Sequence, residues 1–167
     1  ERLAEQQLTV SHGDIRRHVR ALTGVPPRFN RLNASLAEDG LLDTEDPRSW
    51  RGTLLDEYLA AGTLSSVAWA DERGRATWVA RYGDDRAQTY YTIKDGATGG
   101  MMLEYVVGPD GEVPDEPSAS YEYDPRGRPW YQAAAEAGAP VWSEPYLWRG
   151  GEGSEPTLGI SHAHPVH

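Results

Sequence analysis

The sequence predicts an α+β fold, because helical periodicity fills the first third of the chain and strand periodicity fills the rest. At 167 residues and 18.4 kDa the chain corresponds to a single domain, residues 1–167, that is large enough to bury a hydrophobic core. Its 38% of hydrophobic and 25% of charged residues are ordinary for a globular protein.

Residues 1–23 are predicted to form one long amphipathic helix. Its apolar positions recur close to the helical period: Leu8, Ile15, Val19 and Leu22. Gly24 and the pair Pro26-Pro27 predict its end. A narrow apolar stripe that extends beyond the rest of a domain is the usual mark of a helix–helix contact, so we expect a weak homodimer through this helix.

Residues 24–62 are predicted to be a second helical segment in two parts. The first part stops near Gly40, and the second runs from Asp46-Pro47 to Gly62. Asp46 suits the capping position, and Pro47 suits the first helical position because its missing N–H would be unpaired there.

Residues 63–167 are predicted to form an antiparallel sheet. Runs with strand periodicity alternate with turn sequences, the runs being residues 65–69, 76–82, 89–94 and 101–107. In the second run the alternation places Trp78 and Tyr82 on one face and Thr77 and Val79 on the other.

The stretch from Tyr123 to Gly138 is the most informative part of the chain. Residues 124–127, Asp-Pro-Arg-Gly, have the composition of a β-turn. Pro129 suits the first position of a helix, and Gly138 suits its end. The residues just after the turn therefore lie at a helix N-terminus: Arg128, Trp130 and Tyr131.

This arrangement has the chemistry to hold a small anionic or zwitterionic ligand. A helix N-terminus carries partial positive charge and free N–H groups. Arg128 adds a planar fork of donors that matches a carboxylate, while Trp130 and Tyr131 offer ring faces to a cation. The alternative is that both aromatic residues serve core packing on a short helix and the arginines are solvated.

Three ordered blocks of this sequence resemble the signature of the Cache family of extracytoplasmic sensor domains. The first block is Asp124-Pro125-Arg126-Gly127-Arg128-Pro129-Trp130-Tyr131-Gln132-Ala133-Ala134. The second is Trp142-Ser143-Glu144-Pro145-Tyr146, and the third runs from Leu158 to Pro165-Val166. The motifs cover the last third of the chain, and the upstream order of helices and strands is similar to that family as well.

The resemblance implies a PAS-like Cache fold, in which a long N-terminal helix packs on an antiparallel sheet and short helices lie over a ligand pocket. It implies that the pocket is lined by Tyr123, Arg128, Trp130, Tyr131, Tyr146 and Trp142. The amino-acid-binding branch of the family also uses an Asp from a later strand to bind the amine, and this sequence reaches His167 without it. We therefore expect a C-terminal strand to be missing, and the resemblance leaves the choice between an amino acid and another organic acid open.

The same resemblance implies an extracytoplasmic (periplasmic or extracellular) sensor domain that is not an enzyme and uses no cofactor. Its parent would be an inner-membrane receptor such as a histidine kinase, a chemoreceptor or a nucleotide cyclase, whose membrane spans flank this segment. No run here approaches the roughly 18 apolar residues of a span. The net charge of −10 repels phosphate backbones, which makes nucleic acid an unfavourable partner.

Two other function classes remain open from the sequence. Six tryptophans and nine tyrosines could line the flat face of a carbohydrate-binding module. His162, His164 and His167 could contribute to the site of a metal-dependent hydrolase, but the chain has no cysteine and no carboxylate follows Glu155. We therefore expect no metal site.

Overall fold

The computed structural model describes residues 2–82, 88–148 and 156–166; in the first helix it describes the side chains of residues 19, 20 and 22–38. The helices, in chain order, are α1 (Arg2–Glu38), η1 (Pro47–Trp50), α2 (Arg51–Ala61), η2 (Pro125–Gly127) and α3 (Pro129–Ala137). The strands are β1 (Ser66–Ala70), β2 (Ala76–Arg81), β3 (Thr89–Lys94), β4 (Met102–Val106), β5 (Ala119–Tyr121), β6 (Val141–Trp142), β7 (Tyr146–Trp148), β8 (Thr157–Gly159) and β9 (His162–Ala163). The predicted α+β class is confirmed at this level.

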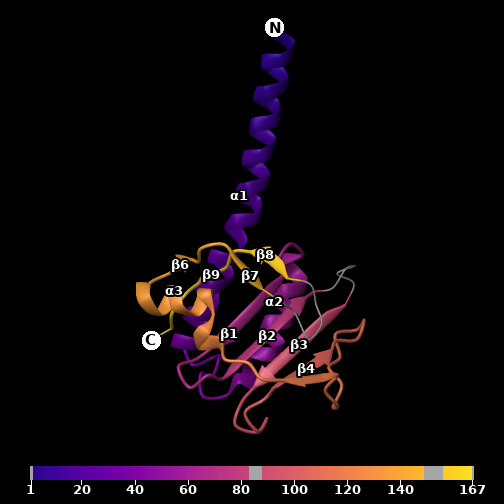
Figure 1. Cartoon of the computed structure of the whole chain (residues 1–167), viewed down its shortest axis with the longest axis vertical. Coiled ribbons are helices and arrows are strands. Elements are labelled where there is room, and N and C mark those ends of the chain that lie inside the picture. Colours follow the sequence, from indigo (N-terminus) through magenta and orange to yellow (C-terminus); the bar gives the residue numbers. More distant parts are fainter. Residues whose placement is uncertain (1, 83–87, 149–155, 167) are drawn as a thin grey trace.

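The first helix is longer than predicted. It continues through Pro26-Pro27 to Glu38, so the end predicted at residue 23 is wrong. Each proline removes one backbone hydrogen bond, which normally ends a helix. Here packing outweighs that loss, because Asn33 and Ala34 beyond the prolines are buried against the domain. The N-terminal half of α1 extends away from the rest of the domain (Figure 1).

The predicted second helical segment, residues 24–62, is only partly confirmed: its first part belongs to α1, whereas its second part begins at Asp46-Pro47 and ends at Gly62 as predicted. The side chain of Asp46 caps η1 by accepting from the backbone N–H of Arg48, and Pro47 is the first residue of that turn. The helix then continues as α2 and ends at Gly62, whose φ of 61° lies in the left-handed region that favours glycine.

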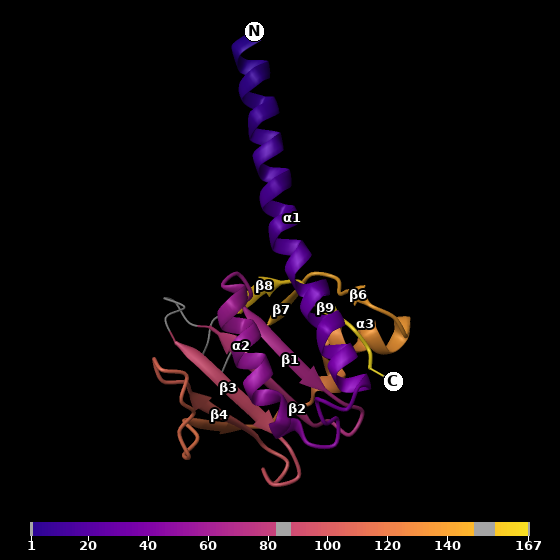
Figure 2. The same ribbon diagram turned by 180° about the vertical axis from the view of Figure 1, so that it is seen from behind.

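The centre of the domain is a five-stranded antiparallel sheet in the order β1-β2-β3-β4-β5, which is the order of the sequence. Helix α2 covers one face of this sheet (Figure 2). The core lies between them and includes Trp50, whose ring stacks on Trp69 with centroids 5.5 Å apart. Val67 and Val79 pair in register on this face, and together with Trp69 they point toward α2.

The opposite face of β1 and β2 carries mostly small residues. Ala68 pairs with Trp78, Ser66 with Ala80, and Ala70 with Ala76. This face is covered by α3 and by two small sheets, β6-β9 and β7-β8. Strand β9 contacts both α1 and α3, so the C-terminal part of the chain connects the first helix to the cover of the sheet.

Candidate ligand-binding site

A cavity of about 880 Å³ lies over the small-residue face of the sheet. Ala68, Ala70 and Ala80 contribute to its floor, and residues of α1, α3 and β7 contribute to its walls. The volume follows from the sequence of the strands, because alanines leave space where larger side chains would have filled it. A cavity of this size is in the range used by small-molecule ligands.

The turn before α3 sets the direction of the two arginines in the motif. Asp124 accepts from the backbone N–H of Arg126 and pairs with its guanidinium, with Arg126 Nη2 at 2.8 Å from Asp124 Oδ2. Arg126 also donates to the backbone carbonyl of Glu72. The expected turn is therefore observed as a short 3-10 turn, and the Arg126 side chain is held on the outside of the cavity.

Arg128 points the other way, into the cavity wall. Its guanidinium carbon lies 5.9 Å from the ring centroid of Tyr123 and 5.9 Å from that of Tyr146. Both distances are within the range of a cation–π contact. Within residues 2–82, 88–148 and 156–166, no carboxylate forms an ion pair with Arg128. The cation is thus positioned by two aromatic rings and not by a counter-ion.

Tyr123 is one of the two aromatic residues whose rings lie beside this arginine. Its ring meets the edge of Trp78 at a centroid distance of 4.9 Å, and its backbone carbonyl accepts from Lys94 Nζ at 2.6 Å. Burial raises the pKa of its hydroxyl to about 12, although the charge of Arg128 opposes this shift. Tyr123 is therefore a neutral phenol at physiological pH, able to donate to or accept from a ligand.

The structure brings all of the sequence-predicted site residues to one cavity: Tyr123, Arg128, Trp130, Tyr131, Trp142 and Tyr146. Trp130 and Tyr131 start α3 as expected, with ring centroids 5.8 Å apart, and the helix ends at Gly138 with a φ of 57°. Trp142 is the most exposed of the six, at 36%, and its ring packs edge-on against His162. Their role in binding remains a prediction.

Sequence reasoning missed the floor of the cavity and its second aromatic group, formed by Tyr82 and Trp148. The signal for the floor was present in the sequence of β1, Ser-Val-Ala-Trp-Ala, whose alternation of large and small residues places the small ones on a common face. No comparable signal identifies Trp148, because its position depends on the pairing of β7 with β8 across residues 149–156.

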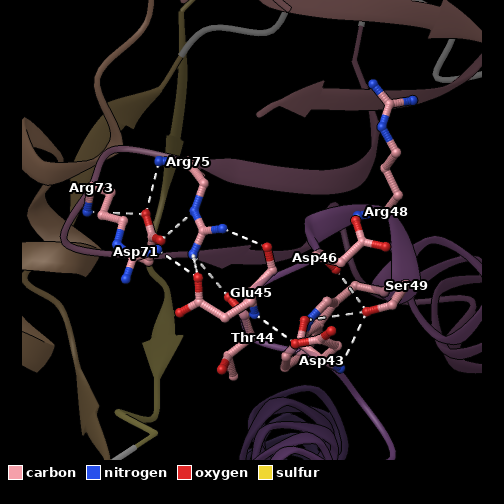
Figure 3. A network of polar contacts seen from close by, with 10 residues as sticks. Asp43, Thr44, Glu45, Asp46, Arg48, Ser49, Asp71, Arg73 and Arg75 are labelled. Atoms are coloured by element: carbon pink, nitrogen blue, oxygen red, sulfur yellow. Dashed lines mark hydrogen bonds and ion pairs between the residues drawn. The ribbon is translucent and has the colours of Figure 1, made fainter. Parts of the chain in front are cut away.

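Charged residues near the start of β2 also border the cavity, but they are engaged with one another (Figure 3). Asp71 accepts from Arg75 Nε at 2.6 Å and from the backbone N–H of Arg75. Arg75 in turn donates to the backbone carbonyls of Thr44 and Glu45. These contacts connect the loop before η1 to the β1–β2 turn, so the network stabilises the fold and leaves Arg128 as the better candidate for a ligand contact.

The histidines near the C-terminus do not form a metal site in the part of the chain that the structure describes. Asn30 Nδ2 lies 3.0 Å from His162 Nδ1 and donates to the backbone carbonyl of the same residue at 2.6 Å. No group of His, Cys, Asp or Glu side chains with metal-binding geometry occurs among the described residues. His167 lies outside them.

No protein-family model, curated protein or solved structure matches this chain. The resemblance of the motif to the Cache family therefore rests on the residues themselves. Within the described residues, no helix combines the length and the apolar character that a membrane crossing requires.

Proposed function

We propose that this chain is a sensor domain that binds a small carboxylate, such as an organic acid or an amino acid, without transforming it chemically. The observation that carries this proposal is the guanidinium of Arg128, which lies at the wall of the cavity between the rings of Tyr123 and Tyr146 and has no carboxylate partner among the described residues.

The physical argument concerns the cost of holding a charge away from bulk water. A partly buried cation needs a counter-ion or several hydrogen bonds, and the described residues supply aromatic faces instead. A ligand carboxylate would complete the site through two parallel N–H···O bonds. Because the rings already fix the guanidinium, little side-chain freedom is lost when the ligand binds.

The position of α1 supports a role in signalling. Its C-terminal half lines the cavity, and its N-terminal half extends beyond the domain. A ligand that changes the cavity therefore acts directly on a helix that leads out of it. This fits an extracytoplasmic domain of a membrane receptor, a histidine kinase, a chemoreceptor or a nucleotide cyclase, in which α1 also contacts a second copy of the chain.

A carbohydrate-binding module is the less favoured class. Sugars stack on exposed aromatic rows, whereas among the described tryptophans and tyrosines only Trp142 reaches 36% exposure. The concave cavity with one cationic anchor is better suited to a small charged ligand.

The proposal is tested by calorimetric titration of the domain with a panel of mono- and dicarboxylates and amino acids. Arg128→Gln should weaken every carboxylate that binds by about thirtyfold or more, which corresponds to the roughly 2 kcal/mol or more for losing one partner of a buried charged pair. Arg126→Gln is the matched control and should leave the affinity unchanged, since Arg126 lies outside the cavity. Equal affinities of the wild type and Arg128→Gln would contradict the proposal.

A further inference from the structure

The cavity continues beyond Arg128 to a second aromatic group. Tyr146 and Trp148 alternate with Leu147 on β7; both rings line the cavity, while Leu147 is 63% exposed on the other side. Trp148 meets Tyr82 edge to face, with centroids 6.3 Å apart and planes at 77°. Two nearly perpendicular rings make two walls of the kind of aromatic cage that accepts a cation.

The side chain of Tyr82 is held in place by Tyr90 and Glu104. Its ring stacks on Tyr90 at a centroid distance of 4.3 Å with planes 4° apart. Its hydroxyl donates to the carboxylate of Glu104, which is only 4% exposed. The phenol of Tyr121, another residue that lines the cavity, favours the charged form of this carboxylate and partly opposes the rise of its pKa. The ring of a phenol that donates to a carboxylate is richer in electrons, which strengthens its attraction for a cation.

Glu104 is a buried acid without a cationic partner among the described residues. Burial raises its pKa to about 6, so it is charged at neutral pH although the fold disfavours that charge. A positive charge bound in front of Tyr82 would compensate it. The aromatic walls and the carboxylate behind them thus favour the same kind of ligand group.

We propose that Tyr82 and Trp148, with Glu104 behind them, form a subsite for an alkylammonium group. This rests on the proposed function, in which Arg128 holds the carboxylate, and it specifies the ligand class as a carboxylate with a positively charged far end. Tyr146 and Trp148 are two residues apart on one strand, which separates them by roughly 7 Å. A short alkyl chain between the two charged groups therefore spans the two subsites.

The experiment compares two probes of the same shape by calorimetric titration. The first is 6-(trimethylammonio)hexanoate, and the second is 7,7-dimethyloctanoate, in which a neutral tert-butyl group replaces the trimethylammonium. We expect the wild type to bind the charged probe at least fivefold more tightly. Trp148→Leu and Glu104→Gln should each reduce this preference to twofold or less, whereas Leu147→Ala, on the outer side of β7, should preserve it.

The affinity for the neutral probe shows that each variant still has a folded site. Equal binding of both probes by the wild type, with the dependence on Arg128 intact, would overturn the cation subsite and leave the carboxylate site standing. A preference that persists in both Trp148→Leu and Glu104→Gln would overturn it as well. If neither probe binds the wild type, the cation subsite is wrong; the carboxylate site is then judged separately by the panel of acids.

Discussion

Ala68 on β1 lies directly opposite Trp78 on β2, and this pairing leaves the floor of the cavity open. Side chains that face each other across an antiparallel pair have Cβ atoms about 5 Å apart, so a residue larger than alanine at position 68 would occupy the space beside Trp78. The methyl group of Ala68 does not, and the edge of Trp78 is free to contact Tyr123. The open space at this point of the floor is thus a direct consequence of one small residue in the register.

Ala68→Leu should fill this part of the cavity. We expect at least a tenfold loss of affinity for any carboxylate that binds the wild type, with a change in unfolding free energy of less than about 1 kcal/mol, because Ala68 is exposed. Titration calorimetry and urea unfolding measure the two quantities. Ser120→Leu, on an exposed position of β5 outside the cavity, is the control and should leave binding unchanged.

The sequence predicts those parts of the structure that depend on local rules. The cap at Asp46, the left-handed end at Gly138 and the strand over residues 89–94 follow from residue type and periodicity. The continuation of α1 through Pro26-Pro27 does not, because it depends on packing contacts between segments distant in the chain. The motif identified Arg128 because its residues are consecutive in the sequence. Tyr82 and Glu104 became recognisable only when the sheet placed Tyr82 at the cavity and Glu104 behind it.

Asp71→Asn should destabilise the fold by about 1–3 kcal/mol, since it removes the charge that three donors from Arg73 and Arg75 share. The side chains of Asp71 and Arg75 are 9% and 17% exposed, so water replaces the lost contact poorly. Glu45→Gln is the control. The side chain of Glu45 is 65% exposed; it pairs with Arg73, which is 58% exposed, and its contact with Arg75 is longer, at 3.7 Å. Its removal should change the stability by less than about 0.5 kcal/mol. Urea unfolding with similar losses in both variants would contradict this distinction.

Glu104 should make the fold less stable as the pH rises. Its pKa is about 6 in the folded state against an ordinary value of 4.5, so between these values the folded state binds more protons. Below pH 4.5 the carboxyl is neutral in both states and carries no penalty, and above pH 6 the penalty is complete, at about 1–2 kcal/mol.

Glu104→Gln removes this titration. The quantity to compare is the unfolding free energy of the variant minus that of the wild type. This difference should be about 1–2 kcal/mol larger at pH 7 than at pH 4.5. Denaturant unfolding at a series of pH values measures it. A difference that stays constant across this range would show that Glu104 has an ordinary pKa.

His162 should make the fold more stable as the pH rises, which is the opposite of the effect expected for Glu104. Burial and the nearby His164 lower its pKa, and the amide of Asn30 donates to Nδ1, which requires the neutral ring. The unfolded state then binds more protons just below pH 6.5, so the stability contributed by this contact is complete above pH 6.5 and is lost as the pH falls. His162→Gln should abolish this part of the pH dependence. A wild type and a variant with parallel stability curves between pH 5 and pH 7 would contradict it.

The projecting half of α1 should mediate association between two copies of the chain. Figures 1 and 2 show that it makes no contact with the described rest of the domain. At the point where the helix leaves the domain, Val19 and Leu22 are 50% and 39% exposed, and the sequence continues their apolar stripe to Ile15 and Leu8. Apolar residues at this spacing on a free helix are stabilised by packing against a second helix.

Sedimentation at rising concentration should therefore show a weak monomer–dimer equilibrium. Ile15→Glu should abolish it, because a carboxylate would have to be desolvated in the helix–helix contact. Ser35→Glu introduces the same charge at an exposed position of α1 beside the domain and should leave the equilibrium unchanged. A species that remains monomeric at millimolar concentration would contradict this prediction, and α1, whose C-terminal half lines the cavity, would then transmit a cavity change without a partner helix.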